Sequence, residues 1–171
     1  MFHHQHKLSG KDIARWTAIG PAADTFDAQA CADTLERTPF FTQLRLADRR
    51  ALGAVGVLRS YPAGADLVHE GQRPGVGLYI IMRGCVRITQ QSASDGVRPL
   101  AVLGPGEMFG ELALIDEQPR SATATAIAPT LAFIIPIVDF RAVLQHNPEA
   151  AASLLAQISR RIRTAEVSQV R

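Results

Sequence analysis

The sequence predicts a mainly β fold with flanking helices, in which an antiparallel sandwich, barrel or jelly roll lies between N-terminal and C-terminal helices. Between residues 55 and 135, short β-rich runs alternate with turn signals such as Pro-Ala-Gly and Gly-Pro-Gly at near-regular spacing. Before and after this stretch, the apolar positions have helical spacing. The chain has 171 residues, of which 47% are hydrophobic, and this is enough for one domain with a buried core.

The N-terminal part is expected to hold a flexible segment and two helices. Residues 1–24 are weakly patterned and contain a Gly-Pro break. A helix is predicted over 27–37, with polar capping residues before it and a proline after it. A second, amphipathic helix is predicted over 46–55. Its inward-facing residues are predicted to be Leu46, Leu52 and Val55.

The middle of the chain, from 55 to 135, is predicted to form about eight short strands. The clearest β-rich runs are 57–61, 66–70, 78–82, 86–90, 97–103, 121–128 and 131–135. Because turn residues separate successive runs, the strands are expected to pair with reversed direction. The prediction is an eight-stranded antiparallel β-roll that resembles a jelly roll.

After residue 135 the helical period returns as a pair of helices. The first is predicted over 137–145, and a His-Asn-Pro sequence ends it. The second begins at Pro148, a residue type suited to the first helical turn, and runs towards residue 171. Its apolar positions have the spacing of a helix-pair seam. They are Leu155, Ile158, Ile162 and Ala165.

One segment, 109–115 with the arginine that follows it, has the residue types of an anion site. Gly110 lets the backbone turn sharply and approach a ligand closely. The residues after it favour one helical turn, whose first amides can cradle an anion. Arg120 can return to the same place and pair with a phosphate, and Glu111 suits sugar hydroxyls. The combination points to a nucleotide that carries little charge.

Two structural alternatives stay open at this point. Glu111 can serve only to cap a helix, and a Gly-Glu-Leu turn between strands is common. Arg120 can be a surface residue that pairs with Asp116 or Glu117. The residue types alone do not decide between these alternatives and anion binding.

The segment resembles the phosphate-binding cassette of the cyclic nucleotide-binding domain family, which includes the catabolite activator protein and the regulatory subunits of cyclic-AMP-dependent protein kinase. The family pattern is Phe-Gly-Glu-Leu-Ala followed by Arg, a small residue and Ala. Phe109 to Ala113 and Arg120 to Ala122 match it residue for residue. The resemblance covers about residues 35–163 and includes further glycines at turns. It implies an eight-stranded β-roll with N-terminal helices and a C-terminal helical pair.

The resemblance also implies which residues bind the ligand. Arg120 would contact the exocyclic phosphate oxygen, Glu111 the ribose 2′-hydroxyl and Ser121 the phosphate edge. The implied ligand-binding residues are Phe109, Gly110, Glu111, Leu112, Ala113, Arg120, Ser121 and Ala122. The catabolite activator type reads adenine with a Thr-Ser pair, and this chain has Ala165-Glu166 there. Thr164 and Glu166 are therefore the candidate base contacts. We expect cyclic AMP as the ligand, with cyclic GMP as the alternative and no metal or cofactor.

Several other classes of site are disfavoured. The two cysteines, Cys31 and Cys85, lack the spacing of a metal site, and we expect reduced thiols. The histidines at 3, 4 and 6 are interpreted as an incidental tract. A metal-binding cupin barrel needs several histidines in the β region, where only His69 occurs. No nucleophile–base pair or pair of catalytic carboxylates can be assembled from the motif, so we do not expect an enzyme.

Nucleic-acid and membrane functions are also disfavoured. The formal net charge is only +2. The arginines at 160, 161 and 163 are interpreted as a solvated helix face or as partners of carboxylates. The 25 residues from 147 to 171 suffice for one long helix, whereas a helix-turn-helix needs two more, so direct DNA binding is not expected. No run of residues is apolar and long enough to be a signal peptide or to span a membrane, and we expect a cytoplasmic protein.

The predicted function is a non-enzymatic sensor of cyclic nucleotides. Ligand binding would bias the helices between 137 and 171, which would then gain or lose a protein partner, either a second copy of the chain or another protein. One alternative is a ligand-independent interaction module on the same fold. Another is the sensor part of a transcription regulator.

Overall fold

The structure is a computed structural model that describes residues 33, 35–36, 38–73, 77–93, 96–112 and 117–167, with side chains as far as residue 163. In this part of the chain, η1 (Phe41–Gln43) and α3 (Leu46–Val55) precede the strands, and α4 (Ile137–Gln145) and α5 (Pro148–Val167) follow them. The predicted segment 1–24 lies outside the described residues, as does most of the helix predicted over 27–37.

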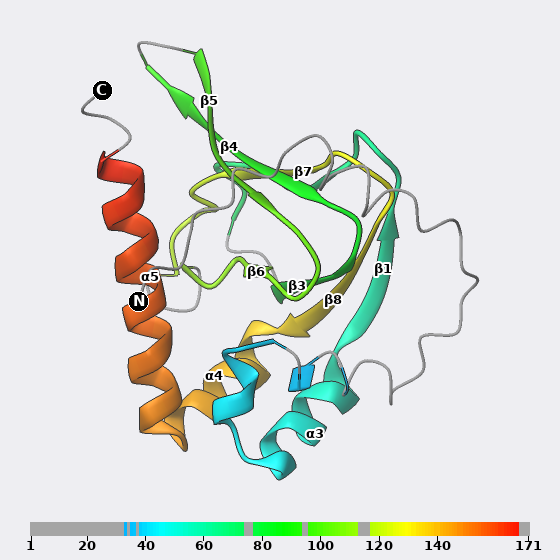
Figure 1. The fold of residues 1–171 in the computed structure, drawn as a ribbon, viewed down its shortest axis with the longest axis vertical. Coiled ribbons are helices and arrows are strands. Elements are labelled where there is room, and N and C mark those ends of the chain that lie inside the picture. The colour runs from blue at the N-terminus through cyan, green and yellow to red at the C-terminus, as the bar shows by residue number, and fades with distance from the viewer. Residues whose placement is uncertain are drawn as a thin grey trace.

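The strands form two four-stranded antiparallel sheets, which confirms the predicted β-roll. One sheet has the order β1-β8-β3-β6 and the other the order β2-β7-β4-β5. Their bounds are β1 Val57–Tyr61, β2 Asp66–Val68, β3 Gly77–Arg83, β4 Val86–Ser92, β5 Gly96–Leu103, β6 Met108–Phe109, β7 Thr123–Ala126 and β8 Thr130–Pro136. Figure 1 shows α5 along one side of the roll, with α3 and α4 together at one end.

The central strands β3 and β8 are buried on both faces. Successive side chains of a strand point to opposite faces, and in β3 the residues Leu78 and Ile80 face the helices while Tyr79 and Ile81 face the interior of the roll. Strand β8 divides its side chains between the same two clusters. The apolar run 78–82 has no polar alternation for this reason. The side chains on the face towards the helices form one cluster, called here the helix-side core. Those on the opposite face form a second cluster, the roll-side core.

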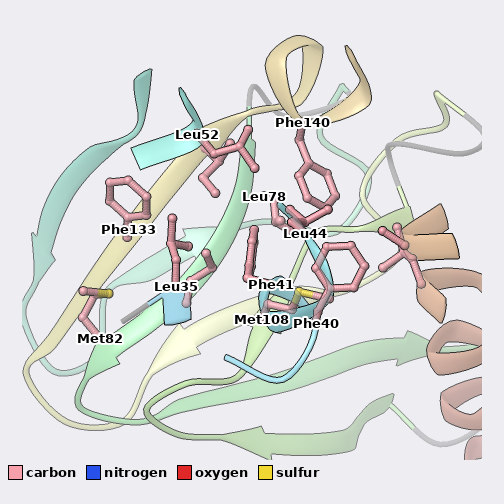
Figure 2. Packing of buried hydrophobic residues seen from close by; sticks show 14 of the residues in the cluster. Leu35, Phe40, Phe41, Leu44, Leu52, Leu78, Met82, Met108, Phe133 and Phe140 are labelled. Carbon is pink, nitrogen blue, oxygen red and sulfur yellow. The ribbon is translucent and has the colours of Figure 1, made fainter. Parts of the chain in front are cut away.

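The helix-side core joins the helices to the roll through aromatic rings. The rings of Phe40 and Phe41 are 5.2 Å apart at their centroids, and Phe140 of α4 lies 5.5 Å from Phe40. These edge-on arrangements suit the charge distribution of aromatic rings. Figure 2 shows the three rings beside Leu78 and Met108 of the roll. Burial of these side chains holds α4 against the roll, and α5, which follows α4 directly, packs into the same core.

Helix α3 has the predicted bounds but not the predicted orientation. Leu52 is buried, whereas Leu46 is 46% exposed and Val55 is 41% exposed, so the prediction that all three face the core is wrong. The helix is rotated so that Asp48 lies on the same face as Leu52, four residues later, and accepts a hydrogen bond from Asn147. A polar contact with the α4–α5 junction thus takes the place of an apolar one.

Helix α5 also differs from the predicted seam. Ala150, Leu154 and Ile158 pack into the helix-side core, while Leu155 is 53% exposed and Ile162 is 49% exposed. The three buried residues are four apart and form one stripe along the helix, which contacts the roll as far as Ile158. Of the predicted seam, Ile158 therefore packs inward and two residues face outward, and the side chain of Ala165 lies outside the description. None of the described helices is long and apolar enough to cross a membrane.

The start of α5 is attached to the N-terminal helices by side-chain hydrogen bonds. Asn147 donates from Nδ2 to Asp48 Oδ2, at 3.1 Å, and to the carbonyl of Val143, at 2.7 Å. Six residues further along, the Oγ of Ser153 accepts from Nε2 of Gln43 at 2.9 Å. The first turns of α5 are thus held by α3, α4 and η1.

Candidate functional site

The chain turns sharply at Gly110, directly after β6. The φ angle there is +89°, which favours glycine over residues with a side chain. A Cβ atom at this position would lie 2.6 Å from Nη1 of Arg120 and 3.2 Å from the carbonyl oxygen of Gly77. Both conformation and space therefore require glycine, and the guanidinium of Arg120 approaches the backbone closely because no side chain intervenes.

The backbone of Arg120 is fixed against the turn between β2 and β3. Its carbonyl accepts from the amide of Gly71 at 2.8 Å, and its amide donates to the carbonyl of Gln72 at 2.9 Å. The side chain is 5% exposed, and it donates from Nη1 to the carbonyl of Gly110 at 3.2 Å and from Nη2 to that of Gly77 at 3.0 Å. Its Nε is buried and has no hydrogen-bond partner among the described residues.

Burial governs the electrostatics of this arginine. It lowers the pKa of Arg120, and the nearby Tyr79 and Glu111 act in the opposite direction. An arginine stays protonated in proteins, so the site holds a buried positive charge with one N–H donor that is unpartnered within the described part of the chain. The alternative in which Arg120 is a surface partner of Glu117 is wrong, because Glu117 instead accepts from Arg141 of α4 at 2.7 Å. Asp116, the other partner considered, lies outside the described residues.

Glu111 is buried beside this arginine and is paired with helix α5. The residue is 6% exposed, and its Oε1 accepts from Nη1 of Arg161 at 2.5 Å. Nη2 of the same arginine donates to the carbonyl of Met108 at 2.9 Å. The described hydrogen bond of Glu111 thus goes to an arginine rather than to a helix amide. The expectation that the arginine cluster of α5 contacts carboxylates is confirmed for Arg161.

The remaining predicted residues lie around this centre or outside the description. Phe109 is buried, Leu112 packs against the helix-side core, Ser121 is exposed and Ala122 is half-buried. The carbonyl of Ser121 accepts from Nε2 of Gln90 of β4 at 3.0 Å. Outside the description lie Ala113 and the side chains of Thr164 and Glu166. Among the described residues, no group of His, Cys, Asp and Glu is suited to hold a metal ion.

Three residues of the site were not singled out from the sequence for a role there. The carbonyl of Gly77 receives Arg120, the ring of Tyr79 lies under its guanidinium, and Arg161 pairs with Glu111. Because successive side chains of a strand point to opposite faces, the predicted strand 78–82 places Tyr79 and Ile81 on one face. This is the one feature of the sequence that bears on the position of Tyr79. Nothing in the local sequence predicts the contacts of Gly77, which depend on strand pairing.

Comparison with known proteins identifies the family of the chain. The sequence pattern of the cyclic nucleotide-binding domain matches residues 58–147. The chain belongs to this family. The matched segment contains β1 except its first residue, then β2 to β8 and α4, and it includes both Glu111 and Arg120. The segment from Phe109 to Ala122, which resembles the phosphate-binding cassette of this family, lies within the matched residues.

The relatives of this cyclic nucleotide-binding domain include transcriptional regulators. The Cyclic AMP receptor protein of Thermus thermophilus is 38% identical over 109 residues, which are 64% of this chain and 50% of the relative. The crystal structure of the Thermus thermophilus Catabolite Activator Protein matches with a TM-score of 0.66 and 35% identity, over 77% of this chain and 61% of that one. The sensor domain of the transcriptional regulator DNR from Pseudomonas aeruginosa matches with a TM-score of 0.70 and 25% identity, over 80% of this chain and 91% of that one. The chain spans about half the length of the curated relatives it matches.

Proposed function

We propose that the chain is a cytoplasmic, non-enzymatic sensor that binds cyclic AMP between Arg120 and Glu111. The observation that carries the proposal is the buried guanidinium of Arg120, whose Nε lacks a partner among the described residues. A buried donor without an acceptor is costly, and an anionic ligand relieves this cost. The site therefore fits a ligand that brings its own acceptor oxygen.

The charge of the site fits a cyclic monophosphate. Such a ligand has one negative charge, which one arginine balances without a metal ion. A guanidinium can donate two parallel hydrogen bonds to phosphate oxygens, and Nε is one donor of such a pair. The lack of a side chain at Gly110 lets the guanidinium of Arg120 lie directly against the turn that precedes Glu111.

The second end of the ligand is assigned to Glu111. A carboxylate accepts hydrogen bonds from hydroxyl groups, and a ribose 2′-hydroxyl is such a donor. Because Glu111 adjoins Gly110, the same turn serves both the phosphate and the sugar. Cyclic AMP is preferred over cyclic GMP because relatives such as the Cyclic AMP receptor protein of Thermus thermophilus carry names that refer to cyclic AMP.

Transmission would run from Glu111 to helix α5. Arg161 forms an ion pair with the carboxylate of Glu111. A ribose hydroxyl that donates to the same carboxylate would therefore change the strength of this ion pair. The outward side chains of α5, Leu155 and Ile162, are seven residues apart and lie on one face. We propose that this face docks on a protein partner, either a second copy of the chain or another protein, and that the ligand biases the docking.

Titration calorimetry with cyclic AMP and cyclic GMP tests ligand binding. The wild-type chain should bind cyclic AMP more tightly, and Arg120→Ala should weaken binding on the order of 100-fold, the loss expected for two charged hydrogen bonds. Arg50→Ala, at an exposed position of α3, is the matched control and should bind like wild type. No heat from either nucleotide at high micromolar concentration would overturn the proposal.

Sedimentation velocity tests whether a second copy is the partner. If the outward face of α5 mediates self-association, Ile162→Asp should reduce the sedimentation coefficient to that of a monomer while cyclic AMP binding is retained. Val138→Asp, at a position of α4 that is 71% exposed, serves as the control. A monomer for the wild-type chain with and without cyclic AMP would leave another protein as the partner.

A further inference from the structure

The guanidinium of Arg120 lies over the aromatic ring of Tyr79. The Cζ atom of Arg120 lies 5.6 Å from the centroid of the Tyr79 ring, within the range of a cation–π interaction. Both residues are buried, with exposed fractions of 5% for Arg120 and 7% for Tyr79. The attraction between a cation and an aromatic face is stronger when both are removed from water. The ring thus faces a buried charge whose Nη atoms bind two carbonyls and whose Nε has no partner among the described residues.

The ring itself is held rigidly by a neighbouring strand. Tyr79 of β3 pairs with Phe109 of β6 in antiparallel register, and their rings stack with centroids 4.9 Å apart and planes 13° from parallel. Phe109 directly precedes Gly110, whose carbonyl accepts from Arg120. The ring that stacks on Tyr79 and the carbonyl that binds Arg120 therefore belong to adjacent residues. Because the Tyr79 ring is held in place, it can hold the plane of the guanidinium beside it.

The two carbonyl contacts of Arg120 do not by themselves fix the plane of its guanidinium. Hydrogen bonds to Gly110 and Gly77 hold Nη1 and Nη2, yet two end contacts allow the planar group to tilt about the line that joins them. Contact with an aromatic face opposes this tilt because the attraction is greatest for a cation centred over the ring. The direction of Nε, the donor left for a ligand, depends on that plane.

We propose that Tyr79 is a positioning residue, whose aromatic face holds the guanidinium of Arg120 in the plane that an anionic ligand needs. The proposal rests on the proposed function, since the ligand is the cyclic nucleotide. It assigns a ligand-binding role to a core residue of β3 that does not belong to the phosphate-binding cassette. The relevant property is the electron-rich face of the ring and not the hydroxyl group.

Calorimetry with cyclic AMP on a series of variants at this position tests the proposal. Tyr79→Phe keeps the face and should bind within about twofold of wild type, whereas Tyr79→Leu should bind about tenfold more weakly, which corresponds to about 1.4 kcal/mol. Replacement of Tyr79 by mono-, di- and trifluorinated phenylalanines keeps the shape but withdraws charge from the face. Affinity should fall stepwise along this series, which a merely structural role would not produce. Thermal unfolding of each unliganded variant checks that it is folded.

The outcomes separate the two proposals. If wild type binds cyclic AMP but the fluorinated series has constant affinity, or Tyr79→Leu binds like wild type, then Tyr79 is only a core residue and the inference is overturned. If Tyr79→Phe is as weak as Tyr79→Leu, the hydroxyl group matters and the inference is likewise overturned. If wild type binds neither cyclic nucleotide, the proposed function itself fails, and the inference fails with it.

Discussion

Arg161 of helix α5 donates a hydrogen bond to Glu111, a residue 50 positions earlier in the chain, and the two side chains form an ion pair with an Nη1–Oε1 distance of 2.5 Å. The exposed fraction is 43% for the Arg161 side chain and 7% for that of Glu111. One partner is therefore reachable from solvent, while the other lies within the candidate site. The pair is a direct physical link between the segment that follows β6 and the C-terminal helix.

Replacement of Arg161 by alanine should destabilise the protein. The variant leaves the buried carboxylate of Glu111 without its described partner, and the free energy of unfolding should fall by about 2 kcal/mol. Arg163→Ala, two residues further along α5 at an exposed position, is the control and should change it by less than about 0.5 kcal/mol. Urea denaturation of both variants measures the difference. Equal stability of the two variants would contradict the role of the ion pair.

Substitution of Gly110 should act mainly on ligand affinity. Gly110→Ala and Gly106→Ala both place a side chain at positive φ, at a cost of about 1 kcal/mol each. A Cβ at Gly106 meets nothing within 4 Å, whereas one at Gly110 lies 2.6 Å from Nη1 of Arg120. Displacement of that charged group should weaken cyclic AMP binding by at least about tenfold in Gly110→Ala alone. Similar affinities of the two variants in calorimetry would count against the close approach.

The contribution of Asp48 to stability should depend on pH. A hydrogen bond from Arg45, then one from Asn147, lowers the pKa of Asp48 below its ordinary value. A carboxylate with a lower pKa in the folded state stabilises the fold above the unfolded pKa of about 3.9, and this contribution is lost as the pH falls through the folded value. The difference in unfolding free energy between wild type and Asp48→Asn should therefore be larger at pH 7 than at pH 3.

Urea denaturation at these two pH values checks that prediction. Arg45→Ala removes the main cause of the lowered pKa of Asp48. In the Arg45→Ala background, the difference in unfolding free energy between Asp48 and Asp48→Asn should therefore depend less on pH. A difference between wild type and Asp48→Asn that stays the same from pH 7 to pH 3 would show that the charge of Asp48 has no part in stability.

Cys85 should be unreactive as long as the protein is folded. The thiol is buried, and burial raises its pKa, which disfavours the reactive thiolate. In a Cys31→Ser variant, the reaction of Cys85 with a disulfide reagent at pH 8 should be at least about 100-fold slower than in denaturant, because it requires local opening. Equal rates in the folded and denatured protein would contradict the burial of this side chain.

The sequence predicted the elements of the fold well because each is specified by local signals. Turn residues set the ends of the strands, and the helical period together with the His-Asn-Pro break set those of α4 and the start of α5. The strand β6 was not separated from the motif, because two residues are too short to show an alternation. Local pattern therefore identified the elements that are long enough to have a period.

The orientation of the helices could not be predicted in the same way. The rotation of α3 depends on a hydrogen bond between Asp48 and Asn147, which are 99 positions apart. In α5, Leu155 and Ile158 are equally apolar in sequence, and only the packing of the helix against the roll decides which is buried. Long-range contacts override the amphipathic pattern when a helix is short or has apolar residues on two sides.

The centre of the candidate site was predicted in part. The motif placed Gly110, Glu111 and Arg120 in one sequence segment, and in the structure the turn after β6 joins all three. Tyr79 and Arg161 come from β3 and α5, and only the pairing of strands and the course of the helix bring them to the motif. A contiguous motif supplies the groups that face a ligand, whereas their supports are distributed along the chain.

The division of α5 into an inner and an outer side has a consequence for how such domains diversify. Ala150, Leu154 and Ile158 pack into the helix-side core, while Leu155 is 53% exposed and Ile162 is 49% exposed. Substitutions on the outer side can accumulate at small cost in stability, whereas those on the inner side cannot. If α5 docks on a protein partner as proposed, a few surface substitutions would therefore exchange that partner while the residues of the candidate site stay the same.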